Sequence, residues 1–269
     1  MAVIFLFLLA VAVGSLTTMF WIPEEELGRG YFQMNALVIL GLLGIAMVIA
    51  VTHPVRPFGS HAALGATSLG VSLAAMFGYY AAIWRESWDL CRWPLALSLA
   101  AATSALIISG LQLVDQGAPI PFQDTLLIAS LATSALLLGW SLITMLLGHW
   151  YLIAPKLEFK HLVIFCWVLL GIIVARTLMI GSSVAWAMNR PDGVPPVEAL
   201  LEFTANGMFF WVRLLWGILV PVLLGWMSLH CARNQSNQSA TGILYVLVVG
   251  VIIGEITAYY LTLATGIPV

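Results

Sequence analysis

Long apolar stretches separated by short polar breaks run along the whole chain. Read with a window of about 19 residues, this pattern predicts eight spans, each near the roughly 20 residues that a transmembrane helix needs. The sequence therefore predicts an all-α, polytopic integral membrane helix bundle that forms a single transmembrane domain over residues 1–269. The expected spans cover about residues 2–22, 31–51, 63–84, 94–114, 125–153, 161–188, 207–231 and 241–265.

Composition excludes a soluble domain. Hydrophobic residues make up 62% of the chain and charged residues only 8%, with a mean hydropathy of +1.03. A soluble domain carries roughly a quarter charged residues to cover its surface. The net charge of −2 gives no signal for nucleic acid, so membrane lipid is the expected surrounding.

The distribution of Lys and Arg predicts an orientation in the membrane, because cytoplasmic loops carry the excess of positive charge. The N-terminal residues 1–21 lack the basic segment of a signal peptide, so they are expected to be a retained first span. Because the predicted inner loops hold most of the basic residues, both chain ends are expected outside. The compactness of the chain favours a bacterial inner membrane. Six basic residues lie in the predicted inner loops, Arg29, Arg85, Arg92, Lys156, Lys160 and Arg233, against two in the outer loops, Arg56 and Arg190.

Two further patterns concern packing. Residues 196–204 place Glu198 and Glu202 four apart with apolar residues between them, which predicts a short interfacial helix on the outer side. Gly250 and Gly254 form a GxxxG motif, which lets another helix approach closely. In a glycine-rich membrane protein this motif indicates tight packing within the bundle better than dimerisation.

Three ionisable residues, Arg176, Arg213 and Glu255, fall inside the predicted spans. Such a residue costs about 2.5–3.5 kcal/mol on insertion scales, so it needs a partner or a task. A rise of about 1.5 Å per residue places them roughly 22, 27 and 21 Å from the inner ends of their spans, where they could meet in the outer half.

The charge balance of these three residues supports two interpretations. Glu255 could neutralise one arginine in a buried pair that fixes the packing of the last three helices. One carboxylate cannot neutralise two guanidinium groups, so the remaining arginine would suit an anionic group: a haem propionate, a lipid phosphate or a substrate carboxylate. Glu255 could also serve as a protonatable group in a relay.

The histidines form a second pattern, because His149, His161 and His230 lie near one level on the predicted inner side. Haem b needs two axial imidazoles on facing helices at one depth, and His149 with His230 meets this condition. Gly148 and Gly225 would leave space for a flat macrocycle. The alternative is that these side chains simply reach the lipid headgroups.

Other metal and catalytic motifs do not occur in the sequence. Cys91, Cys166 and Cys231 stand far apart without CxxC spacing, so neither zinc nor an iron–sulfur cluster is indicated. Walker A, HExxH and GxSxG motifs are also missing.

The leading hypothesis is therefore a membrane subunit of a respiratory or photosynthetic electron-transfer complex that binds haem b or a quinone within the bundle. In outline, the chain is similar to quinone-handling membrane anchors of respiratory complexes, the polysulfide-reductase type among them. The small extramembrane mass implies partner subunits that deliver electrons. The alternatives are a structural or assembly subunit of a larger membrane complex and a small-solute or proton-coupled transporter; whether the chain is an enzyme stays open.

Overall fold

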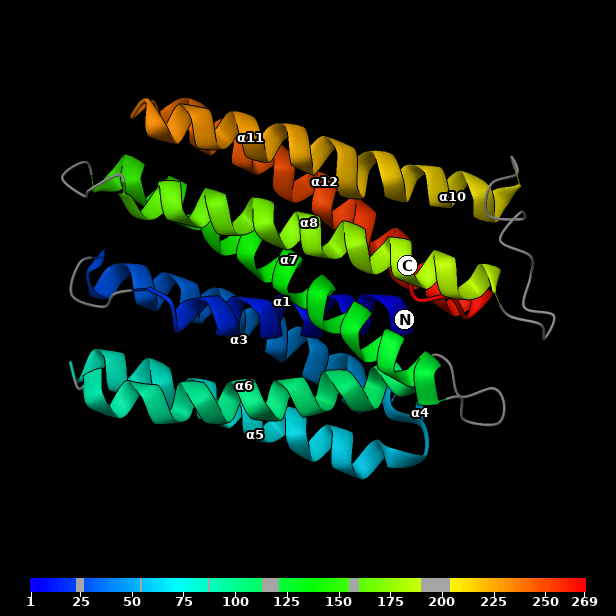
Figure 1. Ribbon diagram of the computed structural model, residues 1–269. Helices are drawn as coiled ribbons and strands as arrows, with labels where there is room; N and C mark the ends of the chain where they lie inside the picture. Colours follow the sequence, from blue (N-terminus) through cyan, green and yellow to red (C-terminus); the bar gives the residue numbers. More distant parts are fainter. Residues whose placement is uncertain (23–26, 54, 87, 113–120, 155–159, 190–203) are drawn as a thin grey trace.

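The protein is an all-helical bundle over the residues that its computed structural model describes, which are 1–22, 27–53, 55–86, 88–112, 121–154, 160–189 and 204–269 (Figure 1). Within these ranges the structure contains helices and no strand. Eight of its helical segments are long and apolar enough to cross a membrane. The predicted fold class is confirmed, and the chain is an integral membrane protein that contacts lipid.

Seven of the spans contain one long helix each, and the seventh span contains three segments. That span consists of α10 (Ala205–Leu214), the π-helical η2 (Leu215–Leu219) and α11 (Val220–Arg233). A short helix α4 (Val55–Phe58) and the 3₁₀ turn η1 (Gly59–His61) precede α5. The single-helix spans are α1 (Ala2–Met19), α3 (Arg29–Thr52), α5 (Ala62–Trp84), α6 (Trp88–Leu111), α7 (Pro121–Ile153), α8 (Lys160–Met188) and α12 (Asn237–Thr265).

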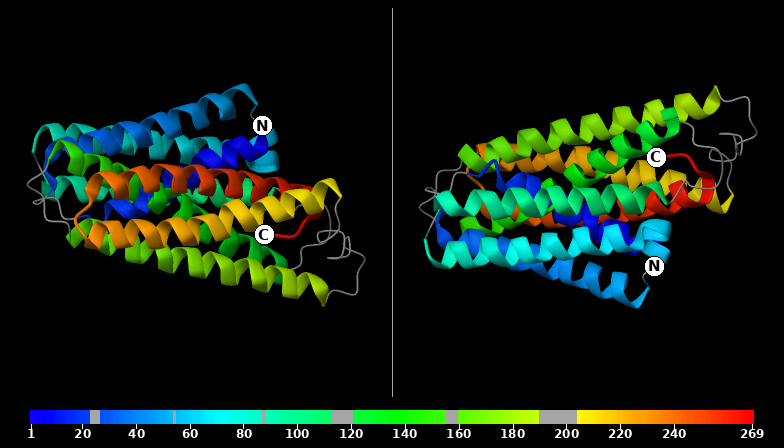
Figure 2. Two further views of the ribbon diagram at one scale, coloured as in Figure 1. Left: turned by 90° about the horizontal axis from the view of Figure 1, so that it is seen from above. Right: turned by 90° about the horizontal axis from the view of Figure 1, so that it is seen from below.

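The spans alternate in direction, so both chain ends lie at one end of the bundle (Figures 1 and 2). We call this end the terminal face and the other end the opposite face. Helices α1, α7 and α12 form the centre of the bundle. In the most apolar 18-residue window of each helix, 72%, 67% and 56% of the residues are buried, respectively. The other helices surround these three and expose apolar side chains outward, as a lipid environment permits.

Glycines set the closest helix crossings in the centre. A Cβ atom on Gly14 would overlap the carbonyl oxygen of Ala135, and one on Gly139 would overlap the backbone of Gly14. Helices α1 and α7 therefore touch backbone to backbone, which small residues make possible in membranes.

The GxxxG motif of α12 also faces a helix of the same chain. A Cβ atom on Gly250 would lie 3.1 Å from the carbonyl oxygen of Trp216, and one on Gly254 would overlap Gly217. The predicted packing within the bundle is confirmed.

Two predicted segments differ from the structure or lie outside it. The fourth span was expected from residue 94, whereas α6 already begins at Trp88 and contains Pro94. Membrane helices tolerate an internal proline because neighbouring groups satisfy the freed carbonyl. The expected interfacial helix 196–204 lies outside the described residues except for Thr204, whose hydroxyl accepts the first cap hydrogen bond of α10 from Gly207 N.

The opposite face carries arginines that pack on aromatic rings. The Arg29 guanidinium lies 4.5 Å from the Trp84 ring centroid and pairs with the exposed Glu86 at 3.0 Å. The exposed Arg233 lies 5.0 Å from the Trp167 ring centroid. Cation–π contacts of this kind suit a membrane–water interface, where one end of each side chain is wet.

Candidate functional site

The three charged residues of the spans meet in one buried cluster. Arg176 comes from α8, Arg213 from the last turn of α10, and Glu255 from α12, and their exposed fractions are 1%, 0% and 0%. Glu255 Oε2 lies 2.9 Å from Arg176 Nη2, and Glu255 Oε1 lies 2.8 Å from Arg213 Nη2. The sequence places these residues at depths where they could meet, and the structure brings them into contact; what they bind remains a prediction.

Arg176 is fully engaged by protein groups. Its Nε and Nη2 donate to the two oxygens of Glu255 at 3.2 and 2.9 Å, which is a bidentate pair. Its Nη1 donates to the carbonyl oxygen and hydroxyl of Ser130 at 3.1 and 2.8 Å and to the Thr133 hydroxyl at 3.3 Å. Nη2 also donates to the Val269 carbonyl at 3.2 Å. Every guanidinium nitrogen has a partner, so Arg176 ties α7, α8 and α12 together.

Arg213 differs from Arg176 because its nitrogens are buried without hydrogen bonds. Nε, Nη1 and Nη2 have no hydrogen-bond partner in the described part of the chain. Its Nη2 lies 2.8 Å from Glu255 Oε1 and so forms an ion pair with the carboxylate, whereas no ion pair or hydrogen bond within the described residues engages Nε or Nη1. A buried donor left without an acceptor costs about 1–3 kcal/mol, and more when it is charged.

The Arg213 guanidinium lies between two glycines. A Cβ atom on Gly217 of η2 would overlap Nη1 of Arg213, and one on Gly254 of α12 would lie 3.0 Å from it. Any larger residue at either position would displace the guanidinium, so these glycines give Arg213 its place next to Glu255.

A π-helical turn begins two residues after Arg213. The segment Leu215–Leu219 leaves the α-helical hydrogen-bond pattern, and Pro221 beyond it has no backbone N–H to restore that pattern. Single π turns occur often at functional sites because they re-aim the side chains around them. In the sequence, Pro221 marks an interruption of this span, but no sequence pattern reveals the π turn.

Sequence reasoning also missed the hydroxyl groups of α7. Ser130 and Thr133 bind Arg176, and the Ser134 hydroxyl lies 2.7 Å from the hydroxyl of Tyr259, which is buried one turn after Glu255. The sequence does contain a signal for them: three hydroxyl residues fall within five consecutive positions inside an apolar span, and all three lie on one face of the helix.

The last residues of the chain also line the cluster. After α12 the coil turns back toward the bundle in both views of Figure 2. Ile267 and Val269 are each 1% exposed and pack in one cluster with Phe210 of α10. The Gly266 carbonyl accepts a hydrogen bond from Gln123 Nε2 at 3.1 Å. This segment therefore holds α7 and α10 together beside the arginines.

The histidines do not form a comparable cluster. His149 is half-buried, with Nδ1 3.2 Å from the Tyr245 hydroxyl, and His161 is buried at the start of α8. His230 lies on the exposed side of α11, whose buried positions include Ser228 and Leu229. Among the described residues, no hydrogen bond or ring contact joins His149 to His230.

The glycines near these histidines are used for helix packing. A Cβ atom on Gly148 would lie 2.9 Å from Thr241 Oγ1, and one on Gly225 would lie 3.0 Å from Leu170 Cδ2. The space that these glycines leave is therefore filled by side chains of neighbouring helices. The haem hypothesis receives no support from this arrangement and stays a prediction.

An absorption spectrum tests the haem prediction directly. If His149 and His230 are axial ligands, the dithionite-reduced minus oxidised spectrum of the purified protein has a b-type α-band, and His149→Ala or His230→Ala removes it. A folded, membrane-extracted preparation without that band would eliminate haem and leave the arginine cluster as the candidate site.

The chain was compared with family models, with curated proteins and with solved structures, and nothing matches in any of the three comparisons.

Proposed function

We propose that this chain is a ligand-binding membrane subunit of an electron-transfer complex and that it holds a quinone at Arg213. The observation that carries the proposal is the fully buried Arg213 guanidinium, none of whose nitrogens has a hydrogen-bond partner among the described residues. The neighbouring Arg176 already takes both oxygens of Glu255. Since Nη2 of Arg213 pairs with Glu255 at 2.8 Å, the donors on Nε and Nη1 are the ones available to a ligand.

The chemistry of a quinone suits this position. Its carbonyl oxygens accept hydrogen bonds, and the negative charge that develops on reduction would be stabilised by the excess positive charge of two guanidinium groups over one carboxylate. This electrostatic stabilisation is stronger in the low dielectric of a bundle interior than in water. The quinone reaches the site from the membrane, in which it dissolves.

Aromatic side chains on the same helices give a quinone ring a place to approach. Phe209 and Tyr260 pack with their ring centroids 4.7 Å apart, and they are 42% and 38% exposed on the outside of the bundle. They belong to α10 and α12, the helices that carry Arg213 and Glu255. An apolar ring could therefore pass from lipid along these side chains toward the guanidinium.

The subunit would work with partner subunits in a defined orientation in its membrane. Partner subunits would deliver the electrons, because the described residues lie almost entirely in membrane helices and their short connections. The distribution of Lys and Arg supports both chain ends outside, and the compactness of the chain favours a bacterial inner membrane.

Quinone binding by the detergent-purified protein tests the proposal. With a short-chain ubiquinone analogue as the probe, Arg213→Gln should weaken binding by about 10- to 100-fold, since a hydrogen bond to a charged group contributes about 1.5–3 kcal/mol. Arg233→Gln is the matched control, because this exposed arginine lies on the opposite face and should leave binding unchanged. Equal binding by all three proteins would overturn the proposal.

A small-anion transporter is the second candidate, and the π turn favours it. Transporters often break a helix beside the substrate site, and η2 interrupts the seventh span two residues after Arg213. Uptake of radiolabelled lactate into proteoliposomes, lost in Arg213→Gln and kept in Arg233→Gln, would favour transport over quinone binding. A structural subunit would show neither activity.

A further inference from the structure

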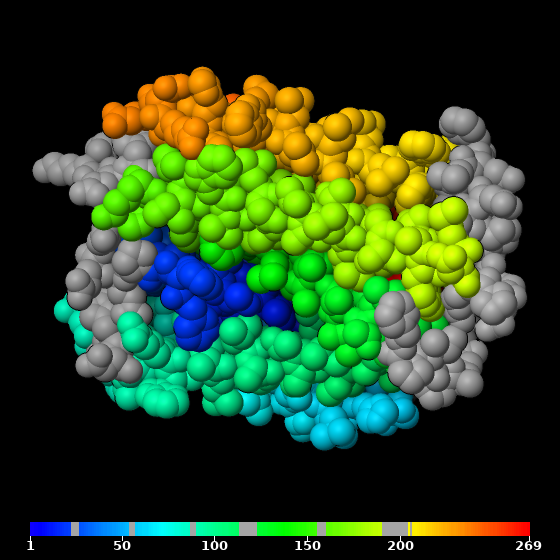
Figure 3. Space-filling view, viewed as in Figure 1, coloured from blue at the N-terminus to red at the C-terminus, as the bar shows by residue number. Residues whose placement is uncertain are grey.

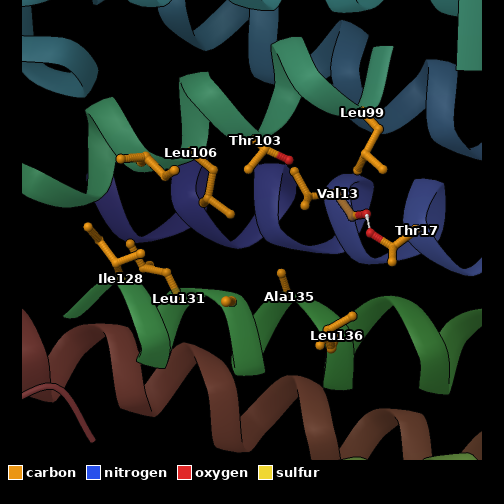
Figure 4. A pocket seen from close by; sticks show the side chains of 11 residues that line it. Val13, Thr17, Leu99, Thr103, Leu106, Ile128, Leu131, Ala135 and Leu136 are labelled. Carbon is orange, nitrogen blue, oxygen red and sulfur yellow. Dashed lines mark hydrogen bonds between the residues drawn. The ribbon is translucent and has the colours of Figure 1, made fainter. Parts of the chain in front are cut away.

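A hollow lies on the other side of α7 from the arginine cluster. It has a volume of about 330 Å³ and lies between α6 and α7, with α1 at its floor. Figure 3 shows α1 at the bottom of this depression on the surface of the bundle. In Figure 4 the side chains of Leu106 and Thr103 from α6 face Leu131 and Leu136 from α7 across the hollow.

The lining of this hollow is apolar. Leucine, isoleucine, valine and alanine side chains make up nine of its eleven lining residues, and Thr17 and Thr103 are the other two. The Thr17 hydroxyl already donates to the Val13 carbonyl at 2.9 Å, as the dashed line in Figure 4 shows. Water would find few hydrogen-bond partners here, and apolar cavities of this kind stay free of water.

The position of the hollow in the membrane restricts its occupant. Its α6 residues run from Leu99 to Ile107 and its α7 residues from Ile128 to Leu136, all inside membrane-spanning helices. At this depth the surrounding solvent is lipid hydrocarbon, or a helix of another chain.

Size distinguishes a hydrocarbon chain from a helix. Each of these nine-residue intervals extends about 12 Å, and the hollow between them has a volume of about 330 Å³. An α-helix about 10 Å in diameter has a cross-section of about 80 Å². One polymethylene chain, with carbon contacts near 4 Å, has a cross-section of about 20 Å². Over about 12 Å a single chain takes up about 240 Å³, which the hollow can hold, whereas a helix takes up about 960 Å³, which the hollow cannot enclose.

The hollow is independent of the arginine site. Ser130, Thr133 and Ser134 point from one face of α7 toward α8 and α12, whereas Leu131 and Leu136 line the hollow from the other face. The molecule bound here is thus a different one from any ligand at Arg213.

We propose that this hollow, bounded by α1, α6 and α7, binds one acyl chain of a membrane phospholipid. Phospholipid is the bulk component at this depth, and the absence of any charged side chain in the lining means that only the hydrocarbon is recognised there. The chain fills a gap over α1 that would otherwise cost the lining residues their dispersion contacts.

Native mass spectrometry after reconstitution tests this proposal. The full chain is placed in vesicles of phosphatidylethanolamine and phosphatidylglycerol and extracted in mild detergent. The mass of the protein with any bound lipid is then measured. Ala132→Phe puts a ring into the hollow from the exposed side of α7, and Leu178→Phe is the control on the exposed surface of α8 outside the hollow. Wild type and Leu178→Phe should retain one phospholipid per chain, and Ala132→Phe should lose it.

A labelling experiment keeps the test decisive if Ala132→Phe folds poorly. A phospholipid with a diazirine in its acyl chain should label α6 and α7 at Leu99–Ile107 and Ile128–Leu136 in the wild-type protein. Labelling spread evenly over all exposed apolar residues, no retained lipid, or a retained isoprenoid in place of a phospholipid would each overturn the proposal.

Discussion

Glu255→Gln is expected to destabilise the folded bundle by about 3–5 kcal/mol, the typical cost of removing one partner from a buried ion pair. Glu255 accepts two hydrogen bonds from Arg176 and pairs with Arg213. Glutamine has nearly the same shape but no charge, so two guanidinium groups would remain in the bundle without a counter-ion. Their mutual repulsion adds to the cost of burying them.

Unfolding by sodium dodecyl sulfate in mixed micelles measures this effect. Glu86→Gln is the control, since Glu86 pairs with Arg29 at the opposite face with 70% of its side chain exposed. An exposed pair contributes about 0–1 kcal/mol, so this variant should unfold like the wild type. If Glu255→Gln also unfolded like the wild type, Glu255 would not be the counter-ion of the arginines.

The depth of the charged residues could be predicted from the sequence because membrane helices are long and nearly straight. A fixed rise per residue is enough to bring Arg176, Arg213 and Glu255 to one level. Their meeting also requires that the three side chains point toward one another, and the cost of charge in lipid makes this orientation strongly preferred.

The different roles of the two arginines could not be predicted in this way. Arg176 is engaged because Ser130 and Thr133 lie on the facing side of α7, more than 40 positions away in the sequence. The rotation of α7 about its axis decides which residues face α8. That rotation follows from the backbone contact of Gly14 with Gly139, a packing detail that no local pattern encodes.

The histidines show the limit of reasoning from depth alone. His149 and His230 fall near one level in the sequence, yet His230 lies on the exposed side of its helix. A helix that is apolar all round gives no polar stripe from which its facing can be read. The depth of a residue in the membrane could therefore be predicted from the sequence. The direction in which its side chain points could be predicted only for charged residues.

Arg213→Met is expected to stabilise the folded protein by about 1–4 kcal/mol, the range seen when a whole buried ion pair is replaced by apolar side chains, because Glu255 keeps Arg176 as its partner and no unpaired charge is left behind. The reason is that Nε, Nη1 and Nη2 of Arg213 are buried without hydrogen bonds among the described residues, whereas Arg176 with Glu255 forms a neutral, fully bonded pair. An arginine that weakens its own fold is typical of a site built for a ligand.

The same detergent-unfolding measurement tests this expectation, with Arg233→Met as the control for loss of an arginine at the opposite face. The quinone-binding assay is run on the same preparations. Higher stability together with lost binding would mean that Arg213 is kept for its ligand at the expense of the fold. Lower stability would mean that the ion pair with Glu255 at 2.8 Å outweighs the missing hydrogen bonds, and Arg213 would then belong to the structural framework with Arg176.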